Sequence, residues 1–448
     1  MNDPINSRLE LFPVTTTCKV KNGHEYLTIG GCDLSHLADK YGTPLYLYDR
    51  ATLDTNVQTY RDALTSLYPA ESGITYAGKA YLCLAIAQWT QSQDLWLDCT
   101  GVGELSIASA AGIQPRSIVL HGVNKTKQDL IAGFEKAGTI VIDNLTELES
   151  ILALAESQIY PCPELWLRLR PGTKVNTHAY TQTGQALSKF GMGAAEIIAA
   201  VNLCISRQMP LNGLHFHLGS HFHDPEPLRA AIEIALRLLA EIRAEAGWYP
   251  QTLSTGGGWG IAYHEDDLPH PSIENYMSVT CESIVKGCME HQLPLPHLQI
   301  EPGRSLVARA GVAIYQIGAV KNTTDRRWLL LDGGLADNPR RALYGARYSA
   351  LPVIDPGRPY GGWAWLAGPY CESGDILIEA LPMADLSPGE WVAIPASGAY
   401  QLSMSSNYNG ARRPTVVWLD RGESYIIQRR ETTEDLIQRD CILKLETK

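Results

Sequence analysis

Short apolar runs alternate with longer amphipathic stretches through the first two thirds of the chain. The runs are rich in apolar, β-branched and aromatic residues, which predicts strands. These predicted strands span 74–79, 95–99, 117–122, 139–144, 165–170, 213–219, 251–257 and 297–303. Between them, apolar residues at three- and four-residue spacing predict helices, among them 82–93, 103–111, 145–157, 227–246 and 273–291. Eight such alternations favour a (β/α)8 barrel, with an open doubly wound sheet as the alternative.

The pattern changes after Arg304. Runs such as "VAIYQIGAV", "DILIEAL" and "TVVWLD" are separated by Gly, Pro and Asp turns and show little helical spacing. This predicts a β-rich second domain over 306–448, behind a barrel over 46–305. The first 45 residues are strand-like in patches and could pack with either part.

Composition narrows the class of protein. The chain has 448 residues, 45% apolar and 19% charged, and a formal charge of −11 without any basic run. A nucleic acid or an anionic membrane is therefore not an expected partner. No apolar window approaches the roughly 20 residues of a membrane span, and the N-terminus lacks the pattern of a signal peptide. The ten cysteines are scattered without a CxxC pair, which predicts reduced thiols and a cytoplasmic protein.

Ionisable residues gather where the predicted strands end. They are Lys79, Asp98, His121, Asp143, Arg170, His217 and Glu301. Because barrel enzymes assemble their sites at the C-terminal ends of the strands, this set predicts an active site there.

Lys79, Glu301 and the glycine-rich run "STGGGWG" at 254–260 together suit one cofactor. Lysine forms a Schiff base with an aldehyde, a carboxylate keeps a pyridine nitrogen protonated, and glycine N–H groups accommodate a phosphate. Pyridoxal phosphate needs all three. Taken singly, a snorkelling surface lysine and a plain glycine turn are the simpler interpretations.

Four histidines lie in "GLHFHLGSHFH" at 213–223. On a strand, His215 and His217 would point to the same side, which suits a zinc site in a barrel hydrolase. A neutral imidazole stacked on a flat cofactor ring is the alternative, and at least two of the four are expected to be structural.

Several ordered motifs carry a family resemblance. "YAGKA", "GLHFHLGS", "GGGWGI" and "EPGRSLVARAG" resemble the fold-type III pyridoxal-phosphate decarboxylases, which share an alanine racemase-like fold. "LADNPRRALYGARY", "GPYCESGD", "GAYQLSMSSNYNGARRP" and "HAYTQTGQALSKFGM" are similar to the diaminopimelate decarboxylase branch. The resemblance runs from about Leu45 to about Arg413. It implies a barrel, a C-terminal β-barrel domain that takes in the N-terminal segment, and a homodimer with shared active sites.

The resemblance also implies roles for individual residues. Lys79 would form the Schiff base, Glu301 would pair with the pyridine nitrogen, and His217 would stack on the ring. The phosphate would be held by Ser220, Gly257, Gly258, Gly303 and Tyr400. The substrate would be bound by Arg304, Arg340, Tyr344 and Tyr400, with the arginines at its distal carboxylate. Cys371 would be the proton donor and Glu372 would bind the distal ammonium, both supplied by the partner chain. No metal is implied.

The predicted reaction is decarboxylation of meso-2,6-diaminoheptanedioate to L-lysine, the last step of lysine biosynthesis. Arginine forks suit a substrate with a second carboxylate, whereas decarboxylases of ornithine or lysine have to bind only a distal amine. Arg341 departs from the family pattern, which usually has proline there, and adds a positive charge beside Arg340. The alternatives are a related decarboxylase acting on another amino acid, a polyamine precursor or a carrier-bound acyl group, and a non-catalytic homologue that binds a partner.

Overall fold

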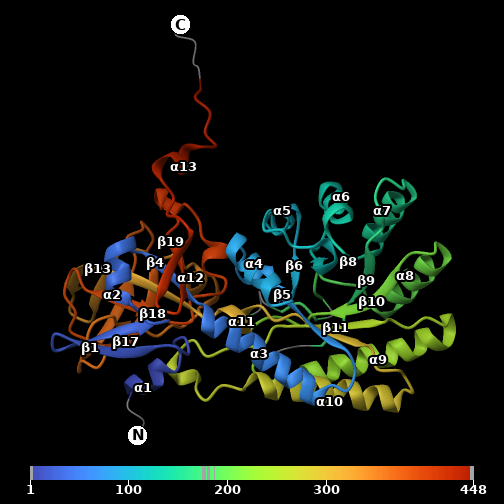
Figure 1. The fold of residues 1–448 in the computed structure, drawn as a ribbon, viewed down its shortest axis with the longest axis horizontal. Coiled ribbons are helices and arrows are strands. Elements are labelled where there is room, and N and C mark those ends of the chain that lie inside the picture. Colours follow the sequence, from blue (N-terminus) through green and yellow to red (C-terminus); the bar gives the residue numbers. More distant parts are fainter. Residues whose placement is uncertain (1–3, 174–177, 179–181, 186, 444–448) are drawn as a thin grey trace. The chain divides into compact units, whose positions relative to one another are not determined.

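The computed structural model describes residues 4–173, 178, 182–185 and 187–443, which form two compact units (Figure 1). The first, here the barrel unit, comprises Leu53–Ile261 and Pro269–Ala308. The second, here the β unit, comprises Met1–Thr52, Ala262–Leu268 and Arg309–Lys448. The short segment 262–268 thus leaves the barrel unit to join the β unit.

The barrel unit contains the predicted eight strands, and within the described residues they close into a parallel barrel in chain order. The strands are β5 (Ser72–Ala77), β6 (Trp96–Cys99), β7 (Ile118–Leu120), β8 (Thr139–Ile142), β9 (Glu164–Leu169), β10 (Leu211–Phe216), β11 (Thr252–Gly256) and β12 (His297–Ile300). Most end one to three residues earlier than predicted. The barrel is therefore confirmed, but most of the predicted strand-end groups lie on the loops that follow.

Helices connect consecutive barrel strands, as the βαβ pattern requires, and one further helix precedes β5 and another follows β12. They are α3 (Arg50–Leu67), α4 (Leu84–Ser92), α5 (Val102–Ala110), α6 (Lys127–Lys136), α7 (Leu145–Glu156), α8 (Ala194–Ser206), α9 (Glu226–Ala246), α10 (Ile273–Glu290) and the short α11 (Arg304–Val307). Local chemistry fixes their ends. Thr126 and Asp129 form a capping box at the start of α6, and Asn144 caps α7. Gly247 ends α9 in the left-handed conformation.

The β unit is built on a mixed sheet whose path runs β17-β16-β14-β13-β4-β19-β20, with β15 and β18 beside it. Its strands are β4 (Leu45–Asp49), β13 (Gly311–Asn322), β14 (Arg327–Leu331), β15 (Leu351–Pro352), β16 (Tyr360–Ala367), β17 (Ile376–Ala384), β18 (Trp391–Ile394), β19 (Thr415–Asp420) and β20 (Glu423–Gln428). A smaller sheet holds β1 (Thr17–Lys21), β2 (His24–Ile29) and β3 (Cys32–Asp33). The helices of this unit are α1 (Pro4–Leu9), α2 (Leu34–Tyr41), α12 (Arg340–Tyr344) and α13 (Thr433–Ile437).

N-terminal and C-terminal residues share one core in the β unit. Leu27 and Leu34 pack in the same buried cluster as Val312, Leu351 and Val417. Strand β4 pairs with β13 on one side and with β19 on the other. These contacts place the N-terminal segment with the β-rich part of the chain.

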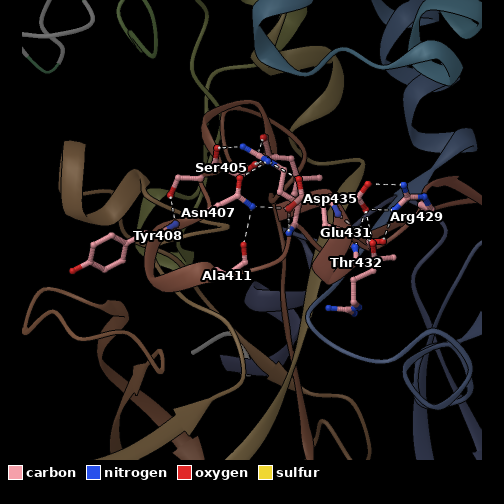
Figure 2. A network of polar contacts seen from close by, with 12 residues as sticks. Ser405, Asn407, Tyr408, Ala411, Arg429, Glu431, Thr432 and Asp435 are labelled. Atoms are coloured by element: carbon pink, nitrogen blue, oxygen red, sulfur yellow. Dashed lines mark hydrogen bonds and ion pairs between the residues drawn. The ribbon is translucent and has the colours of Figure 1, made fainter. Parts of the chain in front are cut away.

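A polar network orders the segment 405–413 of the β unit (Figure 2). Arg413 lies 2.6 Å from Glu431 and donates to Asn407 at 2.8 Å, and the Asn407 amide donates to Glu431 at 2.6 Å. Asp435 accepts from the Thr432 N–H at 2.8 Å and thereby caps α13. Because Arg413 and Glu431 are both partly exposed, we attribute local order to this network and little global stability.

Candidate active site

Lys79 lies in a 3-10 turn, Gly78–Ala80, directly after β5. Its ammonium is 2.8 Å from Oδ2 of Asp98, a fully buried residue of β6, while 43% of the lysine side chain is exposed. Gly78 allows this approach, because a Cβ there would lie 2.6 Å from the carbonyl oxygen of Asp98. The lysine is thus an amine at the rim of the barrel, held by a buried carboxylate.

Glu301 follows β12 and is buried, with 5% of its surface exposed. Its Oε1 accepts a hydrogen bond from Ser254 of β11 at 2.7 Å, and its Oε2 lies 3.1 Å from Nε2 of His215 on β10. Nε2 of His121, which follows β7, is 3.4 Å from Oε1. Three other strands of the barrel therefore contribute to fixing this carboxylate.

His217 comes directly after β10 and is half-buried. Burial and the positive charge of Lys79 hold the pKa of His217 well below its ordinary value. Its Nδ1 accepts a hydrogen bond from the Gly257 N–H at 3.2 Å, so the imidazole is neutral with its proton on Nε2. Gly256 has a positive φ of 67°, and a Cβ there would meet Nδ1 of His217 at 2.7 Å, which explains a glycine at this position.

The loop after β10 meets the loop after β12. Arg304 at the start of α11 donates to the Ser220 hydroxyl at 2.9 Å and is itself buried. Gly303 packs against Ala77 and Ala80, where an added Cβ would lie 3.0 Å and 3.2 Å from their Cβ atoms. Gly303 therefore lies beside the turn that carries Lys79, and Arg304, next in sequence, joins it to the loop that carries Ser220.

Two further strand-end groups have structural partners. Asp143 accepts from the Gly191 N–H at 3.1 Å and lies 3.6 Å from the buried Arg168. Arg170 donates to the Gly191 carbonyl at 2.9 Å. They hold the segment around 190, whose motif was part of the resemblance; residues 179–181 and 186 of that motif lie outside the described residues.

The histidine pair predicted as a zinc alternative does not act as a pair. His215 turns to Glu301, whereas His217 accepts from Gly257. Within the described residues, the group with the donor types and spacing of a metal site is His121, His215 and Glu301, all buried. Glu301 would therefore act either as the partner of a cofactor's ring nitrogen or as a metal ligand.

The β unit carries the other predicted residues, and Arg340 is the most informative of them. It begins α12, is 4% exposed and donates from Nη1 to the Tyr348 hydroxyl at 2.7 Å. Its guanidinium lies over the Tyr263 ring, 4.5 Å from the centroid. Burial alone would lower the pKa of Arg340, but the phenols of Tyr263 and Tyr348 raise it above its ordinary value. No carboxylate pairs with Arg340 among the described residues, so it is a buried cation suited to an acidic ligand.

Tyr344 is the last residue of α12 and donates to the Met404 sulfur at 3.8 Å. Cys371 and Glu372 are exposed on the loop before β17, where the Cys371 N–H donates to the Asn409 side chain at 3.0 Å. Tyr400 has a positive φ of 60°, a strained backbone for a tyrosine.

Arg341 pairs with Glu379 of β17 at 2.5 Å, and both residues line a cavity of about 560 Å³ in the β unit. The extra charge noted in the sequence is therefore neutralised within the same unit.

Comparisons with known proteins show the family of the chain. Residues 50–308 match the family described as "Pyridoxal-dependent decarboxylase, pyridoxal binding domain". The chain is 36% identical over 434 residues to a diaminopimelate decarboxylase of Bacillus subtilis, covering 96% of this chain and 98% of that protein. It is 35% identical over 459 residues to one from Mycobacterium tuberculosis, covering 98% and 99%.

Solved structures give the same picture. Diaminopimelate decarboxylase from M. jannaschii, in complex with L-lysine, is 28% identical with a TM-score of 0.88, covering 96% of this chain and 99% of that one. A lysine/ornithine decarboxylase from Vibrio vulnificus, complexed with putrescine, shares the fold at 22% identity and a TM-score of 0.71, covering 87% of this chain and 97% of that one. Among the described residues, none of the helices combines the length and apolar content that a membrane span needs.

Proposed function

Because this chain belongs to the pyridoxal-dependent decarboxylases, we propose that it releases CO2 from meso-2,6-diaminoheptanedioate and yields L-lysine, the last step of lysine biosynthesis. The observation that carries the substrate assignment is Arg340, a buried guanidinium with aromatic neighbours and no carboxylate partner among the described residues. A substrate with a second carboxylate supplies that partner. L-Lysine and ornithine lack it.

The residues of the barrel unit fit pyridoxal phosphate. Lys79 offers an amine at the rim of the barrel, Glu301 offers a buried carboxylate, and His217 offers a neutral imidazole. Gly258 has a φ of 111° and a Cβ there would overlap the Gly219 carbonyl, so this loop accommodates glycine alone. These are the donor types that the aldehyde, the pyridine ring and the phosphate require.

When bound, the cofactor supplies an electron sink for the pair of electrons left when CO2 departs. We assign Lys79 to hold the aldehyde and Glu301 to keep the proton on the ring nitrogen. His217 would stack on the ring, and as a neutral group it would not oppose the positive charge of the ring. Ser220, Gly257, Gly258, Gly303 and Tyr400 hold the phosphate.

We assign six residues to the substrate, one of which, Tyr400, also belongs to the phosphate set. Arg304, Arg340 and Tyr344 bind the distal carboxylate, Tyr400 lies against the substrate, and Glu372 binds the distal ammonium. Cys371 delivers a proton to the carbon that has lost CO2.

We further propose a cytoplasmic homodimer in which Cys371 and Glu372 act in the active site of the second copy. Both residues are exposed on one loop, which supports a role toward another chain. The Cys371 N–H donates to the Asn409 side chain, which helps to fix the direction of this loop.

CO2 release from purified protein loaded with pyridoxal phosphate tests the substrate. We expect release from meso-2,6-diaminoheptanedioate to exceed that from L-lysine and L-ornithine by at least about 100-fold, the size of a lost charge-assisted fork. Release from a diamine-type amino acid at a comparable rate would favour the alternative decarboxylase. With Arg341 paired to Glu379, that alternative loses the residue that supported it.

A further inference from the structure

In the described part of the chain, the Glu301 carboxylate is a buried negative charge that forms no ion pair with a lysine or arginine. The cations of the barrel unit nearest in the network already have partners: Lys79 is 2.8 Å from Asp98, and Arg168 is 3.6 Å from Asp143. Within the described residues, the ion pairs of Glu301 are with His121 and His215. Burying an ionised carboxylate costs several kcal/mol unless other groups compensate it.

His215 stabilises the Glu301 carboxylate by a hydrogen bond but does not neutralise its charge. Burial lowers the pKa of His215 to about 4, so the imidazole is neutral at neutral pH. Its Nε2 lies 3.1 Å from Glu301, and its buried Nδ1 has no hydrogen-bond partner in the described part of the chain. The ring proton therefore belongs on Nε2, where it is donated to the carboxylate.

Ser254 is the second neutral donor, at 2.7 Å from Oε1 of Glu301. Burial alone would raise the pKa of Glu301, but His215 and His121 hold it well below its ordinary value. The Glu301 carboxylate is thus ionised and fixed in orientation, and it keeps its full negative charge. A cationic group on a ligand would neutralise this charge.

We propose that Ser254 and His215 are positioning residues that keep Glu301 ionised and oriented, so that the site selects a protonated ring nitrogen in its cofactor. His121 completes this arrangement at a longer distance of 3.4 Å. The inference rests on the proposed function, because it takes Glu301 to face that ring nitrogen. It adds a consequence: the apoprotein discriminates between rings by the charge at one atom.

Two ligands and the full-length apoprotein test this inference by binding rather than by turnover. The ligands are pyridoxal phosphate and its 1-deaza analogue, in which carbon replaces the ring nitrogen. We expect the wild-type chain to bind the natural cofactor about 10- to 100-fold more tightly, the range of a hydrogen bond to a charged group. Ser254→Ala and His215→Ala should reduce this ratio by about tenfold each, mainly by weakening binding of the natural cofactor.

His215→Gln restores an N–H donor and should recover most of the ratio. Ser283→Ala is the matched control, because Ser283 is also buried in the barrel unit but donates to the Val279 carbonyl within α10. It should leave both affinities unchanged. An unaltered ratio in both alanine variants, or equal losses for the two ligands, would overturn the inference. Failure of the wild-type chain to bind pyridoxal phosphate at all would instead overturn the proposed function.

Discussion

Replacing Arg340 is the sharpest perturbation of the substrate assignment. Nη1 donates to Tyr348 at 2.7 Å, while Nε is buried without a hydrogen-bond partner in the described part of the chain. Nε is thus a donor that a ligand could satisfy, and together with Nη2 it would form the edge that a carboxylate binds in bidentate geometry. Each charge-assisted bond contributes about 1.5–3 kcal/mol, so losing two costs about 3 kcal/mol or more. Since about 1.4 kcal/mol is a factor of ten, kcat/KM should fall at least about 100-fold in Arg340→Ala.

The assay is initial-rate CO2 release from meso-2,6-diaminoheptanedioate, with thermal unfolding as a check on folding. Arg340→Lys keeps the charge but not the fork, so an intermediate loss of about tenfold is expected. Arg341→Ala is the matched control, because Arg341 is adjacent on α12 but pairs with Glu379. It should change kcat/KM less than about threefold, as half-exposed ion pairs contribute little. A loss below fivefold in a folded Arg340→Ala protein, or equal losses for the two alanine variants, would refute the assignment.

Three other outcomes are expected. Mixing inactive Lys79→Ala and Cys371→Ala proteins should restore about a quarter of wild-type activity if a symmetric dimer shares its sites, and no recovery would exclude sharing. Gly258→Ala should lower the melting temperature and weaken cofactor binding because its φ is 111°, whereas Gly103→Ala, where an added Cβ meets nothing within 4 Å, should do neither; fluorescence-monitored melting decides. Burial lowers the pKa of His215 to about 4 in the folded protein, whereas in the unfolded chain its pKa is about 6.5. As the pH falls below about 6.5, the unfolded state therefore takes up a proton at this residue before the folded state does. The free energy of unfolding should therefore drop by about 2.5 kcal/mol more between pH 7 and 4.5 in the wild type than in His215→Gln, and equal slopes in urea titrations would contradict this.

The barrel could be predicted because both of its periodicities are local. Parallel strands covered by helices are apolar on both faces, so each appears as a short apolar run between helical stretches. The same pattern placed Lys79, His217 and Glu301 close to strand ends, and the structure has them on or next to the loops that follow. What periodicity could not fix was the last one to three residues of each strand, where glycine and proline loops leave the barrel.

The partners of these residues could not be predicted, because they depend on which strands become neighbours. Ser254 is one of many serines in the sequence, and only the adjacency of β11 and β12 brings it to Glu301. Tyr263 lies between predicted barrel elements in the sequence, yet its segment belongs to the β unit. There its ring packs against the Arg340 guanidinium. The direction of Arg341 likewise depends on Glu379 of β17, 38 residues further along the chain. The alternation of His215 and His217 did suggest a shared face, but the end of β10 between them turns the two rings to different partners.

The identity of the lysine that carries the cofactor is the most direct test of this account. The purified protein is loaded with pyridoxal phosphate, reduced with borohydride, digested and mapped by mass spectrometry. The account predicts the added pyridoxyl mass on the peptide containing Lys79, in the turn after β5 and 2.8 Å from Asp98. Modification of another lysine in place of Lys79, or no modification of a folded protein, would contradict it.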